Sequence, residues 1–197
     1  MGETPPPTAA TTRLDGGHPV LDLVNTVYGQ VDGPVELDVL SEPEDLVVLA
    51  VRWGMVEHPV PADAAALRRA RSLRAAVDAL LRAALAGTAP PGPATAVVES
   101  ELRSAYAAGR LVADRDALAW SWPDDDPQLP VHRLAVAAAA LLTDRAELGR
   151  LRCCAACRWL FLDRSRGAGR RWCSMADCGT NAKKRRYVQR RRERRRS

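Results

Sequence analysis

The sequence predicts a mainly α fold of the α+β class, in which a helical N-terminal domain with a small β-hairpin precedes a small cysteine-rich module. Apolar residues recur at helical spacing through most of residues 14–149, and Ala, Val and Leu supply most of the 47% hydrophobic content. Aromatic residues make up only 5% of the 197 residues, which disfavours an all-β sandwich. All five cysteines lie between Cys153 and Cys178, which excludes a disulfide framework spread over the chain.

Three parts are expected along the chain. Residues 1–13 hold three consecutive prolines and several threonines, offer nothing to bury and predict a disordered leader. Residues 14–149 should form the helical domain, and residues 150–197 should form the cysteine-rich module with an Arg-rich tail.

The first two helices are marked by their ends. A short apolar helix is expected after His18-Pro19, because proline is favoured in the first helical turn. Ser41 and Glu44 have the spacing of a capping box, and Gly54 stands where the second helix should end.

Two longer helices should follow. The third is expected from about residue 62 to residue 86, with an apolar stripe on one side and with Gly87 and a proline-rich run after it. The fourth should follow Pro93 and end at Gly109.

After these helices the period of the apolar residues changes. Apolar residues between Leu111 and Trp122 alternate around the polar residues 114–116, which predicts a two-stranded hairpin. The last helix of the domain should begin at Pro130 and carry an almost entirely aliphatic face.

Charge is divided unevenly between the two ends of the chain. Residues 150–197 hold 17 Lys/Arg and 3 Asp/Glu, a net +14, whereas residues 1–149 hold 12 and 21, a net −9, so the total is +5. Such asymmetry is typical of a chain whose basic end binds nucleic acid or another anionic surface.

The cysteines are spaced as metal ligands. Cys154 and Cys157 form one pair, Cys173 and Cys178 form a second, and four thiolates suit a structural, tetrahedral Zn²⁺ ion. The first ligand is Cys154 or its neighbour Cys153, and we prefer Cys154 because its two-residue gap to Cys157 is the commoner knuckle spacing. A set of buried or redox-active thiols is the alternative, which this spacing and a reducing compartment disfavour.

The residues between the two cysteine pairs are expected to form a hairpin. Residues 159–162 have the pattern of an apolar strand, residues 167–169 permit a tight reversal, and residues 170–172 should return the chain to Cys173. A module this short buries little apolar surface, so zinc should supply much of its folding free energy.

Positive charge dominates the C-terminal residues. Ten of the fourteen residues from Lys183 to Arg196 are cationic, so this segment should be frayed when free and ordered by a polyanion, as a helix that leaves the metal module. The residues expected to contact nucleic acid are Arg170, Arg171, Lys183, Lys184, Arg185, Arg186, Arg190 and Arg191.

Double-stranded DNA is the expected polyanion, because the module lacks a platform of exposed aromatic side chains on which single-stranded bases would stack. The alternatives are an RNA-binding module, an adaptor whose basic surface binds an acidic protein partner, and a solvated tail that only aids solubility.

No catalytic role is expected. His18, His58 and His132 are far apart in the sequence and have no nucleophile at motif spacing. The tryptophans of the helical domain suit a small-molecule pocket or a core, and we favour the core. The longest strictly apolar run has nine residues, too few for a bilayer, and no secretory signal is present, so a cytoplasmic protein is expected.

Two parts of the chain resemble known families. Residues 161–166 (FLDRSR) and 171–179 (RWCSMADCG), followed by Ala182-Lys183 and an Arg-rich end, resemble the CGNR-type zinc finger of bacterial proteins. Residues 17–27 (GHPVLDLVNTV) and the helix that ends at Trp53-Gly54 resemble the ABATE domain, which precedes this finger in a family of stress-induced transcription regulators.

The resemblance implies a regulator whose finger binds DNA. We further expect the N-terminal domain to sense a small-molecule effector or to form a homodimer. The family signature Cys-Gly-Asn-Arg is replaced at residues 178–181 by Cys-Gly-Thr-Asn, so a contact made by that arginine in relatives is lost and no sequence preference carries over. The resemblance further implies one zinc ion with these ligands: Cys154 (or Cys153), Cys157, Cys173 and Cys178.

Overall fold

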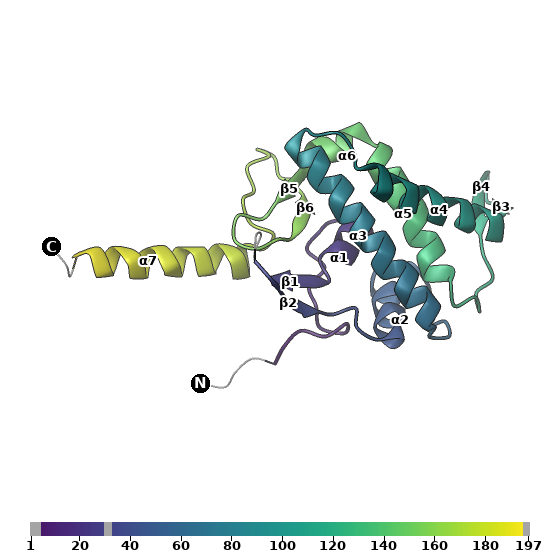
Figure 1. Cartoon of the computed structure of the whole chain (residues 1–197), viewed down its shortest axis with the longest axis horizontal. Coiled ribbons are helices and arrows are strands. Elements are labelled where there is room, and N and C mark those ends of the chain that lie inside the picture. The colour runs from purple at the N-terminus through teal and green to yellow at the C-terminus, as the bar shows by residue number, and fades with distance from the viewer. Residues whose placement is uncertain (1–4, 30–32, 195–197) are drawn as a thin grey trace.

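The computed structural model describes residues 5–29 and 33–194 and has the mainly α, α+β architecture that the sequence predicts. A bundle of helices forms the body, helix α7 extends away from it, and hairpin β3–β4 lies at the opposite end (Figure 1). The helices are α1 (Pro19–Val24), α2 (Pro43–Arg52), α3 (Ala64–Ala86), α4 (Gly92–Ala108), α5 (Leu129–Thr143), α6 (Arg145–Arg150), the π-turn η1 (Met175–Gly179) and α7 (Thr180–Arg194). The strands are β1 (Val27–Gly29), β2 (Val35–Asp38), β3 (Arg110–Asp114), β4 (Ala117–Ser121), β5 (Leu151–Cys153) and β6 (Leu160–Leu162).

Helix α3 is the centre of the body and packs against α1, α2, α4 and α5. The Asp63 carboxylate accepts the backbone N–H groups of Ala65 and Ala66, which are unpaired at a helix start. Gly87 ends the helix at φ 65°, in the left-handed region that glycine adopts without steric cost. No helix within the described ranges has the length and apolar content needed to cross a membrane.

The capping box of helix α2 lies one residue later than predicted, at Glu42 and Asp45. Pro43 opens the helix, and its fixed φ suits this position. The carboxylate of Asp45, rather than Glu44, accepts the backbone N–H groups of Ser41 at 2.9 Å and Glu42 at 2.8 Å. The proline therefore shifts the start of the helix by one residue relative to the expected pair.

The N-terminal segment is ordered where a disordered leader was expected. Residues 8–12 form a turn in which Ala9 is buried. The Arg52 guanidinium at the end of α2 donates to the carbonyl oxygens of Ala9 and Thr12, at 2.6 and 2.7 Å. Hydrogen bonds to a distant arginine thus order a segment that has little apolar surface of its own, while residues 1–4 lie outside the described residues.

Strands form three separate antiparallel hairpins. The predicted one, β3–β4, turns at residues 115–116, with Asp114 opposite Ala117. Hairpin β1–β2 and helix α6 were not predicted from the sequence. These elements have three to six residues each, which is too short for a periodic pattern to be read.

Strand β6 pairs with β5 and not, as predicted, with residues 170–172. Leu151 lies opposite Leu162, and Cys153 lies opposite Leu160. Residues 170–172 instead run beside the first cysteine pair, where the Ala155 N–H donates to the Arg171 carbonyl oxygen at 3.0 Å. The module therefore contains a hairpin and a basic helix, but the hairpin begins before the cysteines.

The two faces of β6 explain this pairing. Leu160 and Leu162 point into the core of the helical body together with Leu151. Phe161 points the other way and packs with Trp159 and the first and third cysteines of the cluster. Because both faces are buried, β6 lies between two cores, and its partner strand β5 follows directly after α6 of the body.

Two of the three tryptophans of the helical domain lie in the core, as favoured. Trp53 and Trp122 are buried, and the Trp122 indole N–H donates to the Ala105 carbonyl oxygen at 2.7 Å. Trp120 is 38% exposed and packs at 4.5 Å against the Tyr106 ring.

Helix α1 contains a buried carboxyl group. The Asp22 side chain is 8% exposed and accepts the Gly16 N–H at 2.8 Å. Burial raises the pKa of Asp22 from 3.8 to about 7, because it disfavours the charged form more than this hydrogen bond favours it.

This raised pKa makes stability depend on pH. Between about pH 4 and pH 7 the folded chain binds a proton that the unfolded chain releases, so the free energy of unfolding should fall as pH rises through this window. Asp22→Asn keeps an oxygen for the Gly16 N–H and should remove this fall, up to about 4 kcal/mol across the window. Urea unfolding at several pH values measures it, with the exposed turn variant Asp116→Asn as control. Identical profiles for Asp22→Asn and the unmodified chain would contradict the assignment.

Candidate metal centre and nucleic-acid interface

A buried amide is one of the contacts that fix the C-terminal module to the helical body. Asn25, the C-cap of α1, is 2% exposed. Its Nδ2 donates to the Leu160 carbonyl oxygen at 2.8 Å, and its Oδ1 accepts the Leu160 N–H at 2.9 Å. The side chain therefore satisfies both backbone groups of a buried strand residue, in place of a neighbouring strand.

Four sulfur atoms meet where the module's turns converge. The Sγ atoms of Cys157, Cys173 and Cys178 are 3.6 to 3.7 Å apart, and Cys154 Sγ completes a group within 4.8 Å. None of the cysteines forms a disulfide. Tetrahedral Zn–S bonds of about 2.3 Å place sulfurs about 3.8 Å apart, so this spacing fits a four-sulfur zinc site.

The chemistry of the cluster calls for a cation. Hydrogen bonds from Cys157 and Cys173 lower the pKa of the Cys154 thiol, since they stabilise its thiolate. In return, the bond to Cys154 raises the pKa of Cys157 to about 12. Four sulfurs this close can all be thiolates only beside a positive ion, which is what a divalent metal supplies.

The alternative first ligand, Cys153, lies outside the cluster. Its position on β5 opposite Leu160 turns the side chain away, and its Sγ is 4.0 Å from a guanidinium nitrogen of Arg82. Successive strand residues point to opposite sides, so of two adjacent cysteines only Cys154 reaches the other three sulfurs.

A carboxylate organises the loop between the cysteine pairs. Asp163 is buried, and its carboxylate accepts the hydroxyl of Ser165 at 2.6 Å, the Ser165 N–H at 3.0 Å and the Arg170 N–H at 2.8 Å. These donors, the Ser165 hydroxyl first, hold the pKa of Asp163 below its ordinary value. The loop is therefore closed by hydrogen bonds rather than by the tight strand reversal expected from its glycines.

Arg170 differs from the other predicted nucleic-acid contacts. Its guanidinium lies 4.5 Å from the centre of the Phe161 ring. Its Nε donates to the Trp172 carbonyl oxygen at 2.8 Å, and a second nitrogen donates to the Cys173 carbonyl oxygen. This side chain is half-buried and supports the turn that carries the third cysteine.

The last cysteine sets the start of α7. Cys178 lies in the π-turn η1, which is followed directly by the helix. Gly179 fits there because an added Cβ would come within 2.9 Å of the Met175 sulfur and 3.1 Å of Trp172. The metal cluster therefore fixes the position of the first turn of α7 and the direction in which the helix leaves.

The remaining predicted contacts are exposed. Arg171 lies 5.3 Å over the Trp172 ring, at the surface of the module. The cations of α7 are exposed. The helix itself extends away from the body (Figure 1). One side of α7 has a shallow hollow lined by Lys183, Arg186, Tyr187 and Arg190.

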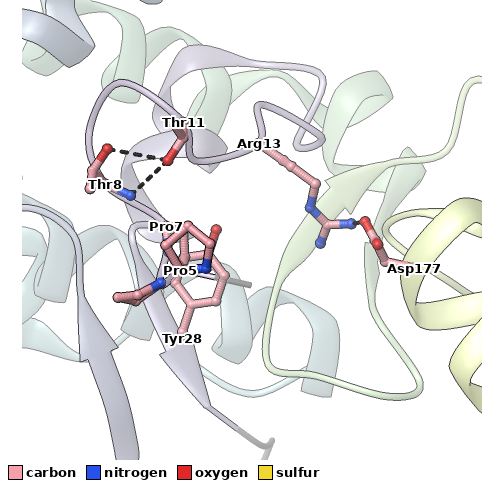
Figure 2. Close-up of a pocket in the computed structure, with 8 residues that line it drawn as sticks. Pro5, Pro7, Thr8, Thr11, Arg13, Tyr28 and Asp177 are labelled. Carbon is pink, nitrogen blue, oxygen red and sulfur yellow. Dashed lines mark hydrogen bonds and ion pairs between the residues drawn. The ribbon is translucent and has the colours of Figure 1, made fainter. Parts of the chain in front are cut away.

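The ordered N-terminal segment contacts the module across an open hollow of about 630 Å³. Arg13 pairs with Asp177 of η1 (Figure 2). Its guanidinium also lies 4.9 Å from the centre of the Trp159 ring. The proline-containing residues 5–7 and Tyr28 line the other walls. Neither Arg13 nor Asn25 was identified from the sequence, because each acts through a residue more than 130 positions away; Asn25 at least lies within the motif that carries the family resemblance.

Two family models match consecutive parts of the chain. A family model described as "Putative stress-induced transcription regulator" (ABATE) matches residues 17–145, and a CGNR zinc finger model matches residues 150–191. No curated protein gave a significant match. The finger and its four clustered cysteines fit one structural zinc ion.

Removing the Asn25 amide should loosen the module from the body. Asn25→Ala leaves the N–H and C=O of Leu160 buried without partners, so the free energy of unfolding should fall by about 2–4 kcal/mol. Asn181→Ala, which changes an exposed asparagine of α7, is the matched control and should have an effect below about 0.5 kcal/mol. Chemical denaturation of both variants measures the difference, and equal losses would contradict the role of Asn25.

The two adjacent cysteines should differ in their effect on metal content. Cys154→Ser replaces a sulfur of the cluster and should lower bound zinc well below one ion per chain, whereas Cys153→Ser should keep it. Elemental analysis of the purified variants measures this. Loss of zinc from Cys153→Ser with retention in Cys154→Ser would reverse the assignment.

Proposed function

The chain belongs to the ABATE family and ends in a CGNR zinc finger, and from that premise we propose that it is a transcription regulator that binds double-stranded DNA through this finger. The proposal takes Cys154, Cys157, Cys173 and Cys178 as the zinc ligands. It assigns phosphate contacts to Arg171 and to the exposed cations Lys183, Lys184, Arg186, Arg190 and Arg191.

The observation that carries the proposal is the exposure of so many cations on one helix that begins at the metal cluster. A helix of 15 residues is about 22 Å long, and an α-helix fits the major groove of B-form DNA. Lys183, Arg186 and Arg190 lie on one side of α7 with Tyr187 among them. Phosphate contacts of this kind supply affinity that does not depend on base sequence.

Two of the predicted contacts are left out of this interface. Arg170 holds the carbonyl groups of the cysteine turn. Arg185 lines a hollow of about 310 Å³ between α7 and the body, together with Glu36 and Asn181. Arg170 is half-buried, and Arg185, although exposed, lies on the side of α7 that borders this hollow.

The helical domain would then serve regulation rather than catalysis. The matched families are regulatory and zinc-finger families, and neither is enzymatic. His18 has a structural role, because its Nδ1 accepts the Val20 N–H and so caps α1. Cysteines that form no disulfide are consistent with a reducing compartment, and we place the protein in the cytoplasm.

The proposal predicts which side of α7 carries the salt dependence of binding. Replacing Arg186 and Arg190 with alanine removes two phosphate contacts and should reduce the slope of log affinity against log salt by about 1.8. Replacing Arg185 and Arg192, two arginines on the other side of the helix, changes net charge equally and should reduce it by less than half as much. Titration of a random-sequence duplex by fluorescence anisotropy at several salt concentrations measures the slopes.

Two outcomes would contradict the proposal. Affinity of the unmodified chain that does not change with salt would exclude phosphate binding. Equal slopes for the two double variants would mean that the basic segment attracts anions without a defined face.

A further inference from the structure

The hairpin β3–β4 exposes apolar side chains that its own domain leaves uncovered. The pairs Leu111 with Trp120 and Ala113 with Leu118 place these four side chains on one face of the hairpin. Leu111 is 53% exposed and Leu118 is 68% exposed. An uncovered apolar face on a projecting element is typical of an interaction surface.

The outer edge of β3 is also open. Within residues 5–29 and 33–194, β3 pairs with β4 alone. A two-residue turn makes Asp114 and Ala117 a hydrogen-bonded pair, so alternate residues of β3 direct their backbone groups toward β4. Leu111 and Ala113 therefore direct their N–H and C=O groups outward, and no bulge or proline blocks this edge.

The sequence of β3 is complementary to itself. If a second copy of β3 is placed antiparallel to the first and centred on Val112, Leu111 lies opposite Ala113 of the second copy. In this register the outward backbone groups of both strands meet as hydrogen-bonded pairs. The same register puts Arg110 opposite Asp114 of the second copy, and symmetry produces this ion pair twice. Arg110 and Asp114 are exposed, and neither forms an ion pair within the part of the chain that the structure describes.

We propose that two chains form a homodimer in which β3 of one copy pairs with β3 of the other, centred on Val112. The two hairpins become one four-stranded sheet, which is stabler than an isolated pair of strands. Leu111 of each copy lies diagonally across the dyad from its counterpart and is partly covered. The hairpin lies at the end of the molecule opposite α7, so both basic helices stay free (Figure 1).

The proposed dimer forms through the outer edge of β3 and does not require the proposed DNA binding. Light scattering during size-exclusion chromatography of the zinc-loaded full chain, over a range of concentrations, should show a species of twice 21.4 kDa. A monomer at every concentration would overturn the inference. A monomer that still binds duplex with the expected salt slope would leave the proposed function intact.

Charge exchange tests the register itself. Asp114→Arg places two like-charged pairs across the interface and should raise the dimer Kd about tenfold, because symmetry applies each change twice. The double variant Arg110→Asp with Asp114→Arg restores opposite charges and should return the Kd to within about threefold of the original. Asp116→Arg makes the same charge change in the turn, outside the paired register, and is the matched control.

These variants distinguish an interface from a general charge effect. Recovery in the double variant alone supports pairing between Arg110 and Asp114. Equal weakening by Asp114→Arg and Asp116→Arg, or no recovery in the double variant, would overturn the proposed register.

Discussion

Strand β6 is buried on both faces, and the rest of the molecule is arranged around that constraint. Leu160 and Leu162 complete the core of the helical body, and Phe161 begins the core of the metal module. Backbone groups buried this deeply need partners on both edges. Strand β5 supplies one set. On the other edge Asn25 pairs with Leu160, and the Gly16 carbonyl oxygen accepts the Leu162 N–H at 2.9 Å. The zinc finger therefore packs directly against the helical body and is not a separate domain joined by a linker.

Because the module packs against the body, zinc is not needed to stabilise all of it. The hairpin β5–β6 is held by apolar burial against the body, so zinc is needed chiefly for the turns that carry the cysteines and for the start of α7. Asp163 and Arg170 support the same turns through hydrogen bonds. The direction of the basic helix thus follows from the cluster, and the position of the cluster follows from the body.

Ion pairs form both within the helical body and between the body and the finger. The acidic residues of the body are partly neutralised by its own arginines, as in the pairs Arg69 with Glu101 and Arg74 with Asp38, both at 2.6 Å. Three further pairs join the finger to the rest of the chain: Arg13 with Asp177, Arg158 with Asp78 at 3.6 Å, and Arg164 with Glu147 at 2.6 Å.

The sequence by itself determined the elements whose signals are local. Periodicity and end signals located the five helices α1 to α5 and hairpin β3–β4, because helix and strand patterns depend on neighbouring residues. Cysteine spacing predicted the four-sulfur cluster, and charge density located the basic helix. The cysteine spacing favoured Cys154 as the first ligand but left Cys153 as the alternative.

Only the tertiary structure decided the pairing of β6, the order of residues 8–12 and the roles of Asn25, Arg170 and Cys153. Each depends on a partner distant in sequence or on which side of a strand a residue faces. Several pairings of β6 are compatible with its short apolar sequence, and the one that buries both of its faces is defined only once the helical body is in place.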